Sequence, residues 1–225
     1  MAWWLLPLLL PIALFLGDFA TGFVHWAVDT WFDEESLGRL VMIAREHHTH
    51  PTHVLHYGFL EHATLGSTIV IPVILPLWGA ARLALPAAGA LAFSFICLVV
   101  ALCLFFGTTL HNLGHRRSRS VILRFLQRNR LLISPAYHAV HHRPPQTVRY
   151  CVVNGWADAV CDRLGLWRHL ERLISRLTGA IPRRDDEDWQ RNWPERLTHW
   201  QARRYGKEPP PFPSRSGQVD YSGGA

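Results

Sequence analysis

Long stretches of this sequence contain no charged side chain. Residues 2–24 contain only Asp18, and residues 63–81 and 83–110 contain none. Each stretch is close to the roughly 20 residues that a helix needs to cross a membrane. We therefore predict membrane-spanning helices at about 2–24, 63–81 and 83–110. Pro72 and Pro76 predict a bend in the second helix.

The sequence also lacks several motifs. Its four cysteines form no CxxC pair, which excludes a zinc ribbon or a disulfide framework and is typical of buried small residues. The HExxH motif of metalloproteases is absent. The first apolar stretch lacks the basic leader and the cleavage site of a signal peptide. No haem or ferredoxin-like motif is fused to the chain, so any electrons must come from a separate protein.

Positive charge is distributed unevenly along the chain. Of the 23 lysine and arginine residues, 20 follow Leu110, and only Arg82 lies between the second and third predicted spans. Basic loops stay in the cytoplasm, which places 25–62 and 111–225 there and Arg82 outside. We expect a multi-pass protein of a bacterial inner membrane or its equivalent. Three spans explain the basic bias, so we predict no nucleic-acid partner.

The predicted fold is all-α and integral to the membrane, with about three transmembrane helices and a cytoplasmic, histidine-rich helical cap. Residues 1–180 form the membrane domain, and 181–225 form a polar, partly disordered tail. Amphipathic helices are predicted at 121–133 and at 156–177, the second with a break at Gly165. The first pattern suits a helix in the lipid headgroup layer and an ordinary packed helix equally well.

Histidine is abundant, and its 14 residues are clustered. Four groups gather just beyond the predicted span ends, on the side assigned to the cytoplasm. The groups are His25; Glu46, His47 and His48; His111 and His115; and His138, His141 and His142.

The spacing within the groups predicts shared faces. His111 and His115 lie at i and i+4, and the group at 138–142 lies at i, i+3 and i+4, so each set shares one side of a helix. His47 and His48 diverge by about 100° on a helix. They could therefore serve two different metals, or one of them could lie behind the ligands.

Eight imidazoles exceed the needs of one metal ion, because a zinc site takes three or four protein ligands. Two ions fit the count better, and imidazole suits iron, zinc, copper and nickel. Asp18 and Asp29 share the His25 face of the first span, where they are candidates for additional ligands or supporting groups, the alternative being a role in helix packing. Further candidates for additional ligands or supporting groups are His56, His62 and Glu46; His50 and His53 receive no assigned role.

At this point the motifs resemble a known family. Residues 17–31 (GDFATGFVHWAVDTW), Arg45 to His48 with Pro51, the histidines at 111 and 115, and residues 138–145 (HAVHHRPP) with 150–155 (YCVVNG) are similar to the Kua-type lipid desaturases. That family includes plasmanylethanolamine desaturases and a plant chloroplast palmitate desaturase.

The resemblance implies two iron ions held by the eight histidines, with O2 as co-substrate and a separate electron donor of the cytochrome b5 or ferredoxin type. It implies a double bond introduced near the head group of a membrane phospholipid chain, as in vinyl-ether (plasmalogen) formation. The chain departs from the plasmanylethanolamine enzymes at Tyr137, Tyr57 and 61–63, and its last histidine box is closer to the plant enzyme.

Other functions would also use histidines in a membrane protein. A fatty-acyl desaturase of the plant type or a lipid hydroxylase would use the same ligands. A b-type cytochrome would need histidines facing each other within spans, and a metal transporter would need polar residues at mid-membrane. The predicted spans offer neither, since Asp18 is their only charged residue.

Overall fold

The computed structural model describes residues 3–32, 47–48, 53–143 and 146–183, and each regular element within these ranges is a helix. The described ranges contain no strand, which confirms the predicted all-α class. In chain order the elements are η1 (Trp3–Leu9), α1 (Leu10–Trp31), η2 (His53–His56), α3 (Phe59–Ile69), η3 (Val70–Ile74), α4 (Leu75–Ala84), α5 (Ala87–Phe105), α6 (Gly107–Leu113), α7 (Val121–Arg128), α8 (Pro135–His138), α9 (Asp158–Cys161) and α10 (Leu166–Thr178).

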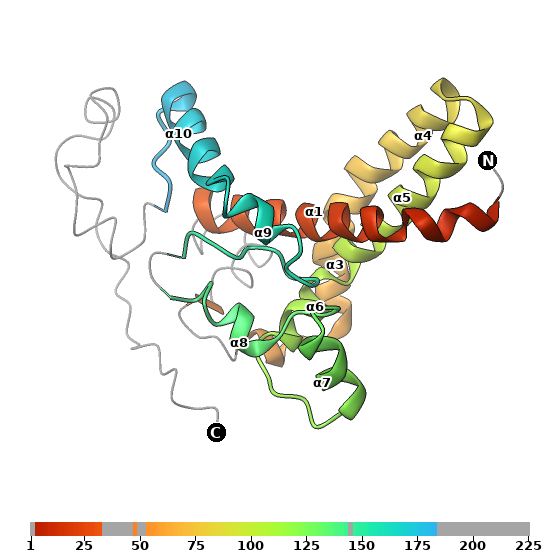
Figure 1. The fold of residues 1–225 in the computed structure, drawn as a ribbon. Coiled ribbons are helices and arrows are strands. Elements are labelled where there is room, and N and C mark those ends of the chain that lie inside the picture. The colour runs from red at the N-terminus through yellow and green to blue at the C-terminus, as the bar shows by residue number, and fades with distance from the viewer. Residues whose placement is uncertain (1–2, 33–46, 49–52, 144–145, 184–225) are drawn as a thin grey trace.

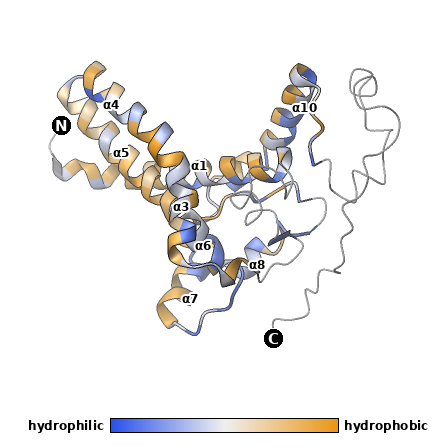
Figure 2. Ribbon diagram, turned by 180° about the vertical axis from the view of Figure 1, so that it is seen from behind, coloured by the Kyte–Doolittle hydropathy of each residue, from blue (hydrophilic) through white to orange (hydrophobic). Residues whose placement is uncertain are grey.

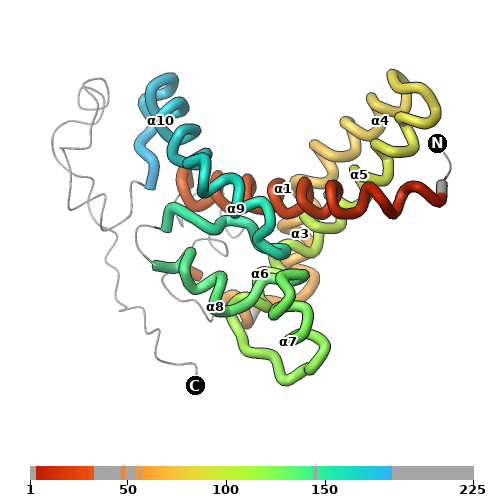
Figure 3. The backbone as a smooth tube through the Cα atoms, viewed as in Figure 1, coloured from red at the N-terminus to blue at the C-terminus, as the bar shows by residue number. Residues whose placement is uncertain are grey.

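Among the described residues, three helical stretches are long and apolar enough to cross a membrane: Trp4–Trp31, Phe59–Ala84 and Ala87–Phe105. Figures 1 and 3 show α5 running back beside the continuous α3–η3–α4 helix, with α1 crossing this pair. All three are largely apolar along their length (Figure 2). Gly17 lets α1 approach α5 closely, because a Cβ at this position would lie 2.5 Å from the Sγ of Cys103.

The helix ends differ from the predicted spans in ways that matter for the site. α1 continues seven residues beyond position 24, so His25 and Asp29 lie on the last turns of the spanning helix rather than beyond it. The third spanning helix ends at Phe105, and a separate short helix, α6, carries His111. α1 continues past His25 and Asp29 because its other positions in these turns, such as Val24 and Val28, are apolar.

The second spanning helix is irregular where its prolines predict a distortion. Pro72 lies within the π-helical turn η3, and Pro76 lies at the start of α4. Proline has no backbone N–H and clashes with the preceding turn, so a wider hydrogen-bond pattern replaces the α pattern there.

The remaining helices form a cap on one end of the spanning helices (Figure 1). α9 ends at Cys161, and Gly165, whose backbone is left-handed (φ 60°), directly precedes α10, so the predicted helix is interrupted there. Trp26 of α1 packs with Tyr150, Cys161 and Trp167 in a buried cluster that joins the cap to the first span. All four cysteines are buried and free, which confirms their predicted role as small packing residues.

Candidate metal centre

Nine side chains from separate segments converge in two groups beside the ends of the spanning helices. Within each group the potential ligand atoms all lie within 4.8 Å of one another. We refer to them as the five-histidine cluster (His47, His111, His115, His138 and His142) and the Asp29 cluster (His25, Asp29, His48 and His141).

The five-histidine cluster has the dimensions of a metal site. The Nε2 atom of His138 lies 2.6 Å from that of His111, 3.1 Å from that of His115 and 3.0 Å from that of His142. Nitrogen ligands bound at about 2.0–2.1 Å and at right angles would lie about 3 Å apart. Both ring nitrogens of His47 are buried without a hydrogen-bond partner among the described residues. A metal ion would satisfy this costly arrangement.

Asp29 supplies an oxygen at the centre of the second cluster. Its Oδ2 atom lies 3.0 Å from the Nε2 of His48, 3.2 Å from that of His25 and 3.3 Å from that of His141. The sequence predicts Asp29 as an additional ligand or supporting group, or else as a packing residue, and the fold places its oxygen among the potential ligand nitrogens. It can therefore bind an ion directly and offset part of its charge.

Backbone carbonyl groups orient two of the Asp29-cluster rings. The Nδ1 of His25 lies 2.8 Å from the oxygen of Tyr150, and the Nδ1 of His141 lies 2.9 Å from that of Val148. A carbonyl oxygen only accepts, so each Nδ1 carries the proton and donates it. The Nε2 atoms are thereby left as acceptors facing the cluster, which is the tautomer that binds metal.

Six of the cluster histidines that lie outside the spanning helices are held neutral. Burial is the main cause, and repulsion from neighbouring imidazoles adds to it. These effects lower the pKa to about 3 at His115 and about 4 at His141, and well below the usual range at His47, His111, His138 and His142. Neutral imidazole is the form that ligates metal, so these rings are prepared for an ion at neutral pH.

The structure divides the neighbouring histidines between the two clusters differently from what helical spacing predicts. His47 and His48 enter different clusters, as their divergence allows. α8 ends at His138 and a turn follows, so His138 and His142 share one cluster while His141 points into the other. The three rings of this box therefore do not share one side. His115 follows the end of α6, yet its Nε2 lies 3.1 Å from that of His111.

Other predicted candidates lie elsewhere. Asp18 belongs to neither cluster, and its carboxyl oxygens accept the backbone N–H groups of residues 153, 154, 155 and 157. His62 is buried on α3 outside both clusters. Glu46 and His50 lie outside the described residues, as do the side chains of His53 and His56. The carbonyls of Val148 and Tyr150 were not predicted, because backbone acceptors leave no signal in side-chain patterns.

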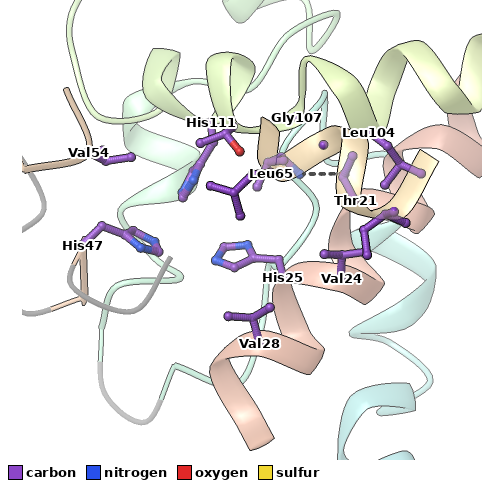
Figure 4. Close-up of a pocket in the computed structure, with 14 residues that line it drawn as sticks. Thr21, Val24, His25, Val28, His47, Val54, Leu65, Leu104, Gly107 and His111 are labelled. Carbon is purple, nitrogen blue, oxygen red and sulfur yellow. Dashed lines mark hydrogen bonds between the residues drawn. The ribbon is translucent and has the colours of Figure 1, made fainter. Parts of the chain in front are cut away.

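An apolar pocket opens beside both clusters (Figure 4). His25, His47 and His111 form its polar end, and they come from both clusters. The rest of the wall comes mainly from α1, α3 and the α5–α6 junction. These residues are Thr21, Val24, Val28, Val54, Leu65, Gly66, Ile69, Leu104, Gly107, Thr108 and Val152.

The comparisons with known proteins agree on one family. Residues 14–185 match the model of a lipid desaturase domain. The chain is 31% identical over 189 residues to a plasmanylethanolamine desaturase of Myxococcus xanthus, covering 81% of this chain and 65% of that protein. It is 32% identical over 185 residues to plasmanylethanolamine desaturase 1 of Mus musculus, covering 77% and 66%.

A third relative is fatty acid desaturase 4, chloroplastic, of Arabidopsis thaliana, which is 27% identical over 82% of this chain and 54% of that protein. This chain thus spans just under two thirds of the first two relatives. No solved structure matches it. The match over residues 14–185 includes both clusters and the pocket, and it confirms the resemblance seen in the motifs: the chain belongs to the lipid desaturase family.

Proposed function

We propose that this protein is a membrane-bound di-iron lipid desaturase. It would remove two hydrogens from adjacent carbons of a lipid chain near the polar head group. The observation that carries this proposal is one apolar pocket whose wall contains histidines of two separate ligand clusters. A site for one metal cofactor alone would not require both groups.

The nine converging side chains would hold the two ions, one in each cluster. Bound iron would supply the activation of O2 that an unactivated C–H bond requires. The five-histidine cluster offers neutral ligands, and Asp29 adds a negative charge to the other. Tyr150 and Val148 keep their histidines in the ligating tautomer through backbone carbonyls.

The pocket would hold the saturated lipid chain against the histidines and exclude water from the reacting carbons. Its wall beyond the histidines is mostly aliphatic, which suits an alkyl or acyl chain and offers no group to bind a charged substrate. The named relatives act on ether phospholipids and fatty acids. We favour the ether phospholipid, with a vinyl-ether product, and keep the acyl chain as the alternative.

The same proposal assigns the clusters to the cytoplasmic side of a bacterial inner membrane or its equivalent. The support is the excess of lysine and arginine after Leu110. Electrons would come from a separate cytochrome b5-type or ferredoxin-type protein on that side.

The test combines iron analysis of the purified protein with lipid mass spectrometry of expressing cells. His138→Ala removes a buried nitrogen at the centre of the five-histidine cluster, and His169→Ala changes an exposed histidine on α10 as the matched control. We expect two irons per chain in the wild type and a lipid product that lacks two hydrogens. His169→Ala should retain both, whereas His138→Ala should bind less iron and form no product.

Three outcomes would contradict the proposal. A product that gains one oxygen instead of losing two hydrogens would indicate a hydroxylase. Haem, or zinc without iron, after anaerobic purification would exclude the di-iron centre. Unchanged iron and product in His138→Ala would exclude the assigned ligands.

A further inference from the structure

Two pocket residues lie one helical turn from the histidines. Thr21 precedes His25 by four residues on α1, and Gly107 precedes His111 by four residues on α6, so each shares a face with its histidine. One turn corresponds to about 6 Å along the helix. Both residues lie on the side of the histidines that leads toward the middle of a spanning helix. A chain that reacts beside His25 and His111 and extends into the membrane helices must pass them next.

Thr21 presents a fixed methyl group at this level. Its hydroxyl donates to the backbone oxygen of Asp18 at 2.7 Å and accepts from the N–H of Val152 at 3.4 Å. These two bonds fix the rotamer of a β-branched side chain that is already stiff. The Cγ2 methyl is therefore held toward Gly107.

Gly107 leaves room at the same level. A Cβ added there would lie 3.5 Å from Cγ2 of Thr21, an ordinary contact, and would meet no other group within 4 Å. Gly107 is also not among the glycines with positive φ, so a side chain is compatible with its backbone. Neither helix packing nor backbone conformation therefore requires a glycine at position 107. The space that a side chain would fill there is open to the pocket.

Gly66, the other glycine in the pocket wall, is different. A Cβ there would lie 2.6 Å from the backbone oxygen of Leu104 and 2.6 Å from the Cα of Phe105. Gly66 therefore permits α3 to contact the end of α5, and a larger residue would push the two helices apart. Its structural role is separate from that of Gly107.

We propose that Gly107, backed by the fixed methyl of Thr21, is a specificity-determining residue that sets how much lipid chain can extend past the histidines. The bare glycine wall admits a long, unbranched, saturated tail. A side chain at position 107 occupies that space and selects for lipids whose chain ends before this level. This inference rests on the proposed desaturase function, because it assigns the pocket to the lipid chain.

The test compares Gly107→Val with Gly79→Val. Gly79 lies on α4 outside the pocket, and a Cβ there meets nothing within 4 Å, so it controls for valine on a helix. The probes are 1-O-alkyl phosphatidylethanolamines with short, intermediate and long alkyl chains. We expect Gly107→Val to lose at least about tenfold in kcat/KM for the longest chain, the scale of an extra methyl in an apolar pocket, and to keep the shortest. Its iron content and unfolding midpoint should equal those of Gly79→Val.

Thr21→Ser tests the opposite wall of the pocket, and it should raise activity on long chains where Gly107→Val lowers it. Serine keeps the hydroxyl that bonds Asp18 and Val152 and removes only Cγ2. In the Gly107→Val background it should restore part of the long-chain activity. Should Gly107→Val not fold, Thr21→Ser alone must still shift the chain-length profile toward longer lipids.

The same chain-length profile in all variants, or an equal loss at every length, would overturn the inference while leaving the desaturase intact. If the wild type converts no probe, the proposed function fails instead. Photolabelling by an ether lipid with a diazirine in its tail then decides the role of Gly107, because Gly107→Val must label less than Gly79→Val. Equal labelling would overturn it.

Discussion

Asp18→Asn should destabilise the protein, although it only replaces one carboxyl oxygen by an NH2 group of similar size. Asp18 is fully buried, and its Oδ1 accepts the N–H groups of Val153, Asn154 and Gly155 at 3.0, 3.0 and 3.3 Å. Its Oδ2 accepts the N–H of Ala157 at 3.0 Å. In asparagine an NH2 donor would face this last N–H. A buried donor without a partner costs about 1–3 kcal/mol, and both the N–H of Ala157 and the new NH2 group would lack one, so we expect a loss of about 2–6 kcal/mol.

The assay is thermal unfolding of the detergent-purified protein, followed by tryptophan fluorescence. At about 2–4 °C per kcal/mol for a chain of this size, the midpoint should fall by roughly 4–24 °C. The matched control is Glu61→Gln, which makes the same change at the solvent-accessible start of α3, where the carboxylate accepts the N–H of Gly58. A midpoint for Asp18→Asn within about 2 °C of this control would refute the reasoning.

Three further predictions concern the Asp29 cluster and the cap. Asp29→Asn should lower bound iron from two ions to one per chain, measured by metal analysis; retention of both would show that the Asp29 oxygen is not a ligand. Burial raises the pKa of Asp158 to about 7 from its ordinary 3.8, so the native state holds a proton that the unfolded chain releases between these values. Stability should therefore fall as pH rises from about 4 to 7, and Asp158→Asn should flatten this slope in urea unfolding; an unchanged slope would assign it to other groups. Glu171 and Arg183 form a buried pair with contacts of 2.8 and 2.7 Å. Each alanine variant should cost about 3–5 kcal/mol and the double variant less than their sum, whereas additive losses in the double-mutant cycle would contradict the coupling.

Much of the architecture was predictable from composition along the chain. The charge-free stretches indicated three spanning helices because hydrocarbon tolerates few charged groups, and the described part of the chain contains three helices long and apolar enough to span. The break at Gly165 and the distortion near Pro72 were predictable because both follow from the backbone chemistry of single residues. The helix ends were less so: polar residues at 25 and 29 suggested the end of a span, but the helix continues because its other faces remain apolar.

The amino-acid pattern was enough to predict the spanning helices, the family and the set of clustered histidines. These follow from local properties: hydropathy, spacing and motif. The division of these side chains into two clusters follows from the fold and not from the spacing within one helix. His25 meets the carbonyl of Tyr150 across 125 positions, and His141 meets His48 across 93. Periodicity relates residues within one helix, whereas these contacts depend on how α1 and the cap pack together. The same packing places the Asp29 oxygen among the histidine nitrogens of its cluster.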